Sequence, residues 1–487
     1  MFGDYVFRES SAEYNNRILL IDNGDFYEIT RYDNTFRANG FEVIHYTNDL
    51  YFRVHYEKKL KSKSGKLLVI ANENQYIPFD IRSEMHECEL SMKTLFPRLN
   101  AAVLSRRSDL DFDLLCCAYR KNYDDLREPE ATEQFIRGEV CNHNNILQLM
   151  NSLYEKLREL AENIRDYRKW FRIAEDKARI DVLSAKYHID FDTSDLNILF
   201  CDYALREYGK LSGELNDDTP VLVSRVMEYI SERSGRFVII VMDGMSEFDW
   251  RILSESFREI TYSKASAFAM IPTVTSVSRQ CLLSNKYPRQ LRNPWTLTHE
   301  KTEFREAAVR LGYEDYQIGY ERGWDADFPA HIQCGAVIIN DIDDLVHGQT
   351  QGRIGMASDV SILAGQDKLV STVKRFLSKR FDVYITADHG NTIRTGIGRL
   401  TGTGLETETK SHCMLVLRDY AEKNRMKSKY DLLEFPKYYL PKKFDYLICK
   451  NGDSFDIQGE KVMTHGGISL DECVAPFVKI MAVNYRG

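Results

Sequence analysis

The sequence predicts an α/β protein whose C-terminal half is a mainly parallel sheet sandwiched between helices. The runs FVIIVM at 237–242, AVIIN at 336–340 and VYIT at 383–386 have the length and apolar character of buried strands. A helical segment near 358–379 separates the last two runs. Strands that alternate with helices form parallel sheets covered on both faces. Ligands of such sheets bind beyond the carboxyl ends of the strands.

The first 115 residues predict a smaller α/β domain. RILLI at 17–21, FEVIHY at 41–46 and LLVIA at 67–71 read as its buried strands. Asp22 follows the first strand and invites comparison with phospho-accepting receiver domains. The third strand, however, ends in Ala71-Asn72, where a receiver would present its acceptor aspartate. The receiver interpretation is therefore rejected.

Residues 116–234 predict a helical domain between the two α/β regions. Apolar residues in steps of four and three place eight side chains on one helical stripe: Ile146, Met150, Leu153, Leu157, Leu160, Ile164, Tyr167 and Phe171. A core-facing helix is the favoured interpretation, ahead of a dimerising coiled coil. The predicted domains are thus 1–115, 116–234 and 235–487.

Composition restricts the class of protein. The 487 residues are 43% hydrophobic and 28% charged, which is typical of a globular protein with two or three cores. The formal net charge of −8 argues against non-specific wrapping of nucleic acid by a basic surface. Ten scattered cysteines without a C-x-x-C predict neither a disulfide framework nor a thiolate zinc site. The polar N-terminus and the short apolar runs predict a cytoplasmic protein with no membrane span.

Carboxylates and imidazoles follow the predicted strands of the C-terminal region. Asp243 follows the first strand, Asp343 and His347 follow the second, and Asp388-His389 follows the third, with His465 in a later T-H-G-G. These side chains are ligands for divalent cations. Taken alone, Asp243 is about as often a helix cap or a turn former, and His465 is more often a surface histidine. The adjacent Asp388 and His389 are the strongest signal, because an apolar strand seldom ends in Asp-His for packing alone.

The segment PTVTSVSR at 272–279 adds a hydroxyl and a guanidinium. Its predicted short helix places Thr275 at a helix N-terminus, where free backbone N–H groups and the helix dipole favour a phosphate. Thr275 could then be both nucleophile and phosphate neighbour, and Arg279, four residues later, could hold an anionic oxygen. A simple helix cap is the alternative for Thr275.

In this order, the motifs resemble those of the alkaline-phosphatase superfamily. MDGMSEFDW, IPTVTSVSR, ITADHGN and THGGISLDECVAPFVKI look most like its PglZ-domain branch, which occurs in bacterial phage-defence (BREX-type) loci and in some signalling proteins. The resemblance covers about residues 235–487 and implies an alkaline-phosphatase-like sheet. It also implies a pair of divalent metals, with Zn²⁺ as first choice and Mn²⁺ as second. One metal would be held by Asp243, Thr275, Asp388 and His389, and the other by Asp343, His347 and His465.

The resemblance implies a metal-dependent phosphoester hydrolase, as a phosphodiesterase of nucleotides or oligonucleotides that forms a phosphothreonine on Thr275. Thr275 is preferred to Thr273 because the diesterase-like P-T-x-T of the superfamily has its nucleophile at the second threonine. The alternatives are a non-catalytic scaffold of a defence complex and a phosphomonoesterase or phosphomutase. Other defence proteins are the implied partners, and the oligomeric state is left open. Since every predicted ligand follows residue 242, residues 1–234 are expected to be dispensable for turnover.

Overall fold

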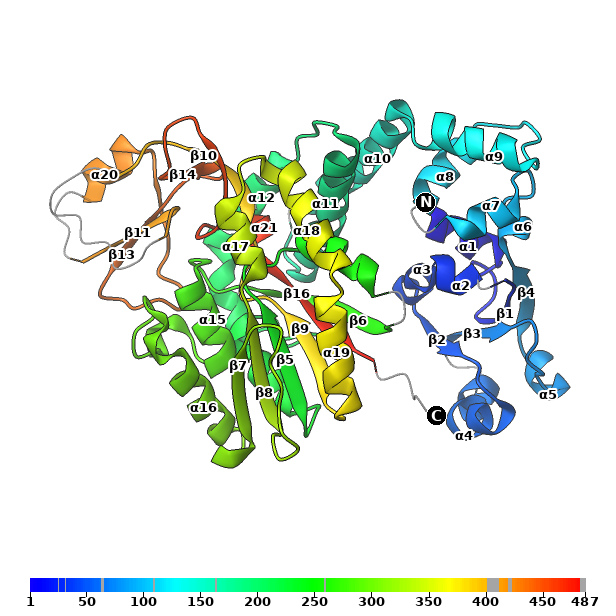
Figure 1. Ribbon diagram of the computed structural model, residues 1–487, viewed down its shortest axis with the longest axis horizontal. Coiled ribbons are helices and arrows are strands. Elements are labelled where there is room, and N and C mark those ends of the chain that lie inside the picture. The colour runs from blue at the N-terminus through cyan, green and yellow to red at the C-terminus, as the bar shows by residue number, and fades with distance from the viewer. Residues whose placement is uncertain are drawn as a thin grey trace. The chain divides into compact units, whose positions relative to one another are not determined.

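A computed structural model describes the mixed α/β chain shown in Figure 1. The described residues are 1–24, 26–30, 32–62, 65–107, 110–162, 164–257, 260–400, 411–418 and 423–481. The chain divides into two compact units, Met1–Ser152 and Leu153–Gly487. The boundary between them falls inside helix α10 (His143–Ala161). The three-domain division with boundaries after residues 115 and 234 stays a prediction.

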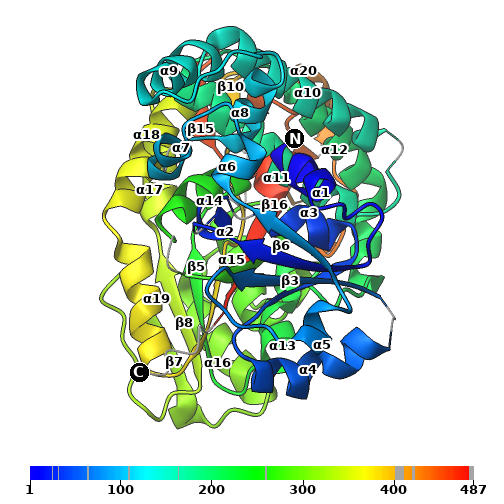
Figure 2. The same cartoon turned by 90° about the vertical axis from the view of Figure 1, so that its right-hand side faces the viewer.

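The first unit contains a parallel sheet of four strands. They are β1 (Arg17–Asp22), β2 (Phe41–His45), β3 (Lys66–Asn72) and β4 (His86–Leu90), in the order β2-β3-β1-β4. The three strands predicted for this region are confirmed. Helices α4 (Asp49–Lys61) and α5 (Phe79–Arg82) cover one face, and α1 (Phe2–Glu9) to α3 (Asp33–Ala38) lie on the other, as Figure 2 shows.

The region between the sheets is mostly helical, as predicted, but its apolar stripe is not one helix. Helix α10 ends at Ala161 and α11 (Arg168–Tyr187) begins seven residues later. Just before α11, the Asp166 carboxylate accepts a hydrogen bond from the Arg168 backbone N–H at 3.1 Å. Such a local side-chain bond competes with helix continuation. Most of the stripe residues are nevertheless buried, Met150 fully, whereas Leu160 and Phe171 are half-buried.

The second unit is built on a six-stranded sheet of order β6-β16-β9-β5-β8-β7. Strands β9 (Asp382–Thr386), β5 (Phe237–Met242), β8 (Cys334–Ile339) and β7 (Ile318–Arg322) are parallel. Strand β16 (Val474–Ile480) runs antiparallel between β9 and β6 (Tyr262–Phe268). Every residue of β5 and β8 is buried, which explains their uninterrupted apolar sequences. The mainly parallel sheet and its three predicted strands are confirmed.

Helices cover both faces of this sheet (Figure 1). One face packs in a common core with α11, α14 (Glu247–Leu253), α18 (Gly352–Gly365) and α19 (Lys368–Ser378). On the other lie α15 (Thr275–Ser284) and α16 (Glu300–Arg310), which pack against each other. The single helix predicted near 358–379 is wrong, because the chain breaks at Asp367, which has a left-handed φ of 53°.

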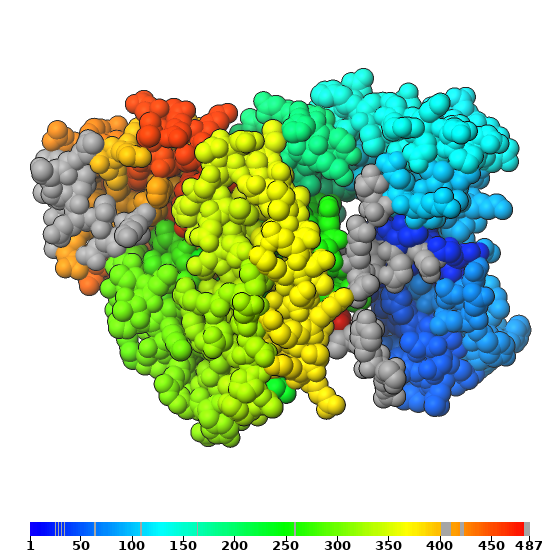
Figure 3. All heavy atoms as spheres, in the orientation of Figure 1, coloured from blue at the N-terminus to red at the C-terminus, as the bar shows by residue number. Residues whose placement is uncertain are grey.

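Among the described residues between β9 and β16, those at 411–418 and 423–464 gather at one end of the second unit, coloured orange to red in Figures 1 and 3. Strand β10 (Thr392–Gly396) pairs with β15 (Lys461–Thr464) so that Thr392 lies opposite Thr464. This pairing brings the sequences after β9 and before His465 together. Among the described helices, none has the length and apolar character needed to cross a membrane.

Candidate metal centre

The carboxylates predicted as ligands meet at one edge of the sheet. Asp243 follows the last residue of β5, Asp388 lies two residues beyond β9, and Asp343 is on α17 (Asp341–Gly348), which follows β8. Because β9, β5 and β8 are adjacent and parallel, their carboxyl ends lie side by side. Gly244 turns the chain there with a φ of 72°, a conformation that favours glycine.

The first cluster joins Asp243, Asp388 and His389, and all three side chains are buried. Their ligand atoms lie within 4.8 Å of one another. His389 Nε2 is 3.5 Å from Asp388 Oδ2 and 3.9 Å from Asp243 Oδ1. Thr275, the first residue of α15, joins this cluster, because its Oγ1 lies 3.2 Å from His389 Nε2. The helix N-terminus predicted at Thr275 is confirmed.

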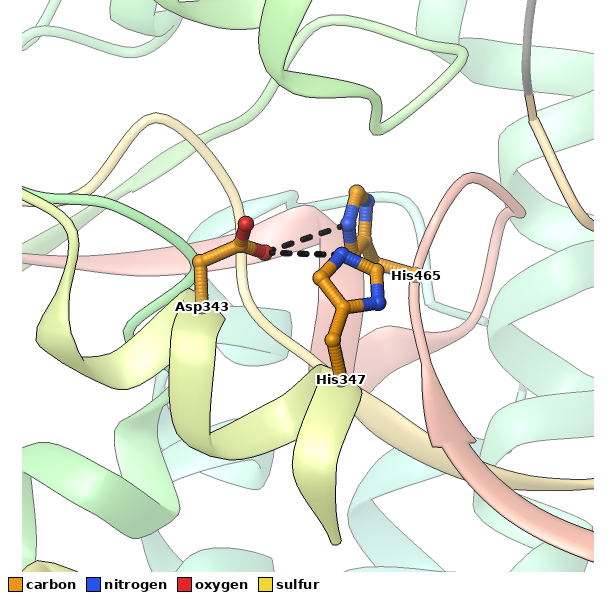
Figure 4. Close-up of side chains that lie close together, drawn as sticks. All are labelled: Asp343, His347 and His465. Atoms are coloured by element: carbon orange, nitrogen blue, oxygen red, sulfur yellow. Dashed lines mark ion pairs between the residues drawn. The ribbon is translucent and has the colours of Figure 1, made fainter.

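The second cluster joins Asp343, His347 and His465, as Figure 4 shows. Asp343 Oδ1 lies 3.5 Å from His347 Nε2, one helical turn away on α17, and 3.3 Å from His465 Nε2. His347 is half exposed and opens this cluster to solvent. The rings of His465 and His389 stack with centroids 4.3 Å apart. The structure therefore brings all seven predicted ligands into one site.

The two buried histidines are held in the tautomer that metal ligation requires. His389 Nδ1 lies 3.0 Å from the carbonyl oxygen of Gly390, and His465 Nδ1 lies 2.9 Å from that of Thr273. A carbonyl oxygen only accepts, so Nδ1 carries a hydrogen, and in the neutral imidazole Nε2 then has the lone pair that a metal needs. Metal-binding histidines are commonly fixed in this way by a second hydrogen bond. Both Nε2 atoms face the carboxylates.

One oxygen atom of each carboxylate has no hydrogen-bond donor. Asp243 Oδ1, Asp343 Oδ1 and Asp388 Oδ2 are buried and accept no hydrogen bond. Burial raises the pKa of Asp388 well above its ordinary value, and the charge of Asp243 adds to this increase. Burial also lowers the pKa of His389 to about 3, so its imidazole is neutral. Buried carboxylate oxygens without donors, together with imidazole nitrogens that face them, are a donor set that a divalent cation satisfies. The residues fit the metals that the sequence predicts.

Arg279 lies behind Asp243 and is 1% exposed. Its Nη1 donates to Asp243 Oδ2, and its Nε donates to Glu300 Oε2 at 2.7 Å. Glu300 in turn pairs with Arg322 at 2.8 Å. These contacts favour a role in fixing Asp243 over the direct contact with a substrate oxygen that the sequence suggests.

The two threonines of P-T-x-T differ in their surroundings. Thr275 is half-buried at the first cluster, whereas Thr273 is fully buried. The Thr273 hydroxyl accepts from Gly466 N and donates to Gly467 O, both at 3.0 Å. Thr273 therefore fastens the loop that carries His465. Sequence reasoning assigned no role to this contact, nor to Glu472, whose Oε1 accepts from Gly467 N at 2.8 Å. Their only sequence signal was proximity to the motifs.

One family model and several solved structures are similar to parts of this chain. Residues 222–480 match the model of the BREX system PglZ alkaline phosphatase-like domain. Murine ectonucleotide pyrophosphatase/phosphodiesterase 5 is similar at 11% identity, covering 50% of this chain and 87% of that chain, with a TM-score of 0.36. Phosphonoacetate hydrolase from Sinorhizobium meliloti 1021 is similar at 9% identity, covering 52% and 91%, with a TM-score of 0.31. No curated protein matches the chain.

The family match spans more than half of the chain and contains every residue of both clusters. It confirms the predicted fold class, an alkaline-phosphatase-like sheet sandwiched by helices. The chain belongs to the PglZ family of alkaline phosphatase-like domains.

Proposed function

We propose that the protein is a metal-dependent phosphoester hydrolase in which Thr275 is the nucleophile and phosphodiesters of nucleotides or oligonucleotides are the substrates. The observation that carries this proposal is the position of the Thr275 hydroxyl. Its Oγ1 lies at the N-terminus of α15, 3.2 Å from His389 Nε2 and beside carboxylate oxygens without hydrogen-bond donors. A phosphate is favoured at a helix N-terminus, so nucleophile and substrate phosphorus would meet there.

Two sets of residues would hold metal ions. Asp243, Thr275, Asp388 and His389 form one set, and Asp343, His347 and His465 form the other. Oxygen and imidazole donors without thiolates suit Zn²⁺, our first choice, or Mn²⁺. When bound, such ions lower the pKa of a hydroxyl group and stabilise the charge that develops on the attacking and leaving oxygens.

The chain itself supplies the nucleophile and its orientation. Thr275 Oγ1 forms a bond to phosphorus while the ester bond to the leaving oxygen breaks, and the departing alcohol takes up a proton. The first-turn N–H groups of α15 orient the phosphoryl oxygens. Water then attacks the phosphothreonine, the bond to Oγ1 breaks, and the Thr275 hydroxyl is restored. Two displacements give net retention at phosphorus. We also propose that this activity serves bacterial phage defence, with other defence proteins as partners; the family description names the BREX system.

Metal binding is expected to stabilise the second unit. Adding Zn²⁺ or Mn²⁺ to the metal-free protein should raise its melting temperature, because a ligand that binds only the folded state adds about 2.7 kcal/mol per site at 100 times its Kd. Elemental analysis together with thermal unfolding measures this effect. A protein that carries no metal, and whose melting temperature neither ion changes, would contradict the proposal.

Replacing Arg279 tests whether this residue acts through Asp243. Arg279→Lys keeps the charge but loses the planar fork that contacts Asp243 and Glu300 together. We expect metal affinity and kcat each to fall by about 10-fold or more, as for partners of metal ligands elsewhere. Arg289→Lys, at an exposed position before α16, is the matched control. An Arg279→Lys variant with normal metal affinity and only a raised KM would instead support direct contact with the substrate.

A further inference from the structure

Asp471 collects buried polar contacts from four elements of the second unit. Its carboxylate accepts from Lys177 Nζ on α11 at 2.8 and 3.1 Å, and from Arg353 Nη2 on α18 at 2.7 Å. It also accepts from Asn197 Nδ2 on α12 (Ser194–Glu207) at 3.2 Å and from Thr392 Oγ1 on β10 at 3.0 Å. Four donors around one buried carboxylate hold it in a single position.

Lys177 is 2% exposed, and its ammonium has no role in the site described above. Besides Asp471 it contacts Asp181 Oδ2, one turn along α11, at 2.8 Å. Arg353 approaches the same Asp181 oxygen at 3.5 Å. The group therefore balances two cations against two carboxylates. Removing one partner of such a buried group leaves a charge without compensation.

The loop with two predicted metal ligands rests on the segment that contains Asp471. Gly390 N donates to Glu472 O at 2.9 Å. A Cβ on Gly390 would lie 2.1 Å from the Asp471 carbonyl oxygen, so the two backbone segments pack directly against each other. Thr392 closes the same loop through its bond to Asp471. Asp471 therefore holds part of the loop that Asp388 and His389 begin.

We propose that Lys177 is a positioning residue of the metal centre, which acts through Asp471 on the loop that carries Asp388 and His389. This inference rests on the proposed function, because it concerns the same metal site. It assigns a part of that site to α11, a helix that precedes the sheet by fifty residues. A residue that only stabilised the packing of α11 would leave the geometry of the metal ligands unchanged.

Cobalt(II) binding to the full-length protein tests this role, because the visible absorption of bound Co²⁺ reports ligand geometry without turnover. We compare wild type with Lys177→Met, Thr392→Val and the double variant. Lys177→Met should weaken Co²⁺ binding by about 10- to 100-fold and change the spectrum, and Thr392→Val should act in the same direction. Because both act through Asp471, the double variant should bind hardly more weakly than Lys177→Met. Lys169→Met, an exposed position on α11, is the control and should bind as wild type does.

The outcomes separate positioning from stability. If Lys177→Met lowers the melting temperature of the metal-free protein but leaves Co²⁺ affinity and spectrum unchanged, the positioning role is wrong. It is equally wrong if the effects of the two single variants multiply in the double variant. Lys177→Arg keeps the positive charge and should bind Co²⁺ as wild type does. If Lys177→Met does not fold, the Co²⁺ affinities of Lys177→Arg and Thr392→Val test the positioning role in its place. Wild-type protein that binds no Co²⁺ would overturn the metal centre itself, which is a different failure.

Discussion

Thr275→Ala is expected to lose on the order of 10³-fold or more of its phosphodiester turnover while its metals remain bound. The variant removes the oxygen that lies 3.2 Å from His389 Nε2 and leaves the other six ligands in place. Turnover of an artificial diester, measured on protein of known metal content, checks the result. Thr275→Ser keeps a hydroxyl at the same position and should retain much of the activity.

Thr273→Ala is the matched comparison two residues away. The Thr273 hydroxyl is buried and bonded to Gly466 and Gly467, so its loss should cost about 1–3 kcal/mol of stability. Its effect on turnover should be only about fivefold, equivalent to ~1 kcal/mol. If Thr275→Ala keeps wild-type turnover, or Thr273→Ala is the inactive variant, Thr275 is not the nucleophile. In a phage-restriction assay, Thr275→Ala also separates an enzymatic role from a scaffold role.

The parallel sheet and the convergence of the ligands could be predicted from sequence because their signals are local. Strands such as 237–242 are uninterrupted apolar runs, and this pattern follows from burial on both faces. The topological rule for parallel sheets then places Asp243 and Asp388 at one edge. The sequence does not predict the distance between these two carboxylates, but the pairing of β5 with β9 brings them together.

The helix breaks could not be predicted from apolar spacing. The periodic pattern runs through Asp166, whose side chain bonds to the backbone N–H of Arg168 at the start of α11. At Asp367 a single left-handed residue separates α18 from α19. Both effects depend on one residue, whereas the spacing of apolar side chains averages over several turns.

Contacts between segments far apart in the sequence could not be predicted either. The spacing of residues placed Arg279 on the same helical face as Thr275 and suggested that it holds an anionic oxygen. In the structure its guanidinium contacts Asp243 and Glu300 instead. The bond from Lys177 to Asp471 joins residues 294 positions apart. It also changes the expectation that residues 1–234 are dispensable, because α11 belongs to the same compact unit as the sheet. Removing α11 would take its own residues Ala178 and Ala185 out of the core of the sheet and leave Asp471 without Lys177.

Metal removal should have an effect as large as the loss of Thr275. The metals are expected to supply several kcal/mol of charge stabilisation, and each 1.4 kcal/mol corresponds to about tenfold in rate. Chelation should therefore lower turnover by about 10³-fold or more, and added Zn²⁺ or Mn²⁺ should restore it. Removing the metals from the Thr275→Ala variant should slow turnover hardly more than either change does alone. The two losses do not multiply, because the hydroxyl group and the metals act in the same step.

The most direct test is the hydrolysis of an artificial phosphodiester and the corresponding monoester by full-length protein loaded with Zn²⁺, before and after chelation. We expect turnover of the diester to exceed that of the monoester, to disappear with chelation and to return with metal. Faster turnover of the monoester would contradict the diesterase assignment. Protein with both metals bound that hydrolyses neither ester would contradict the central claim that this site is a hydrolase.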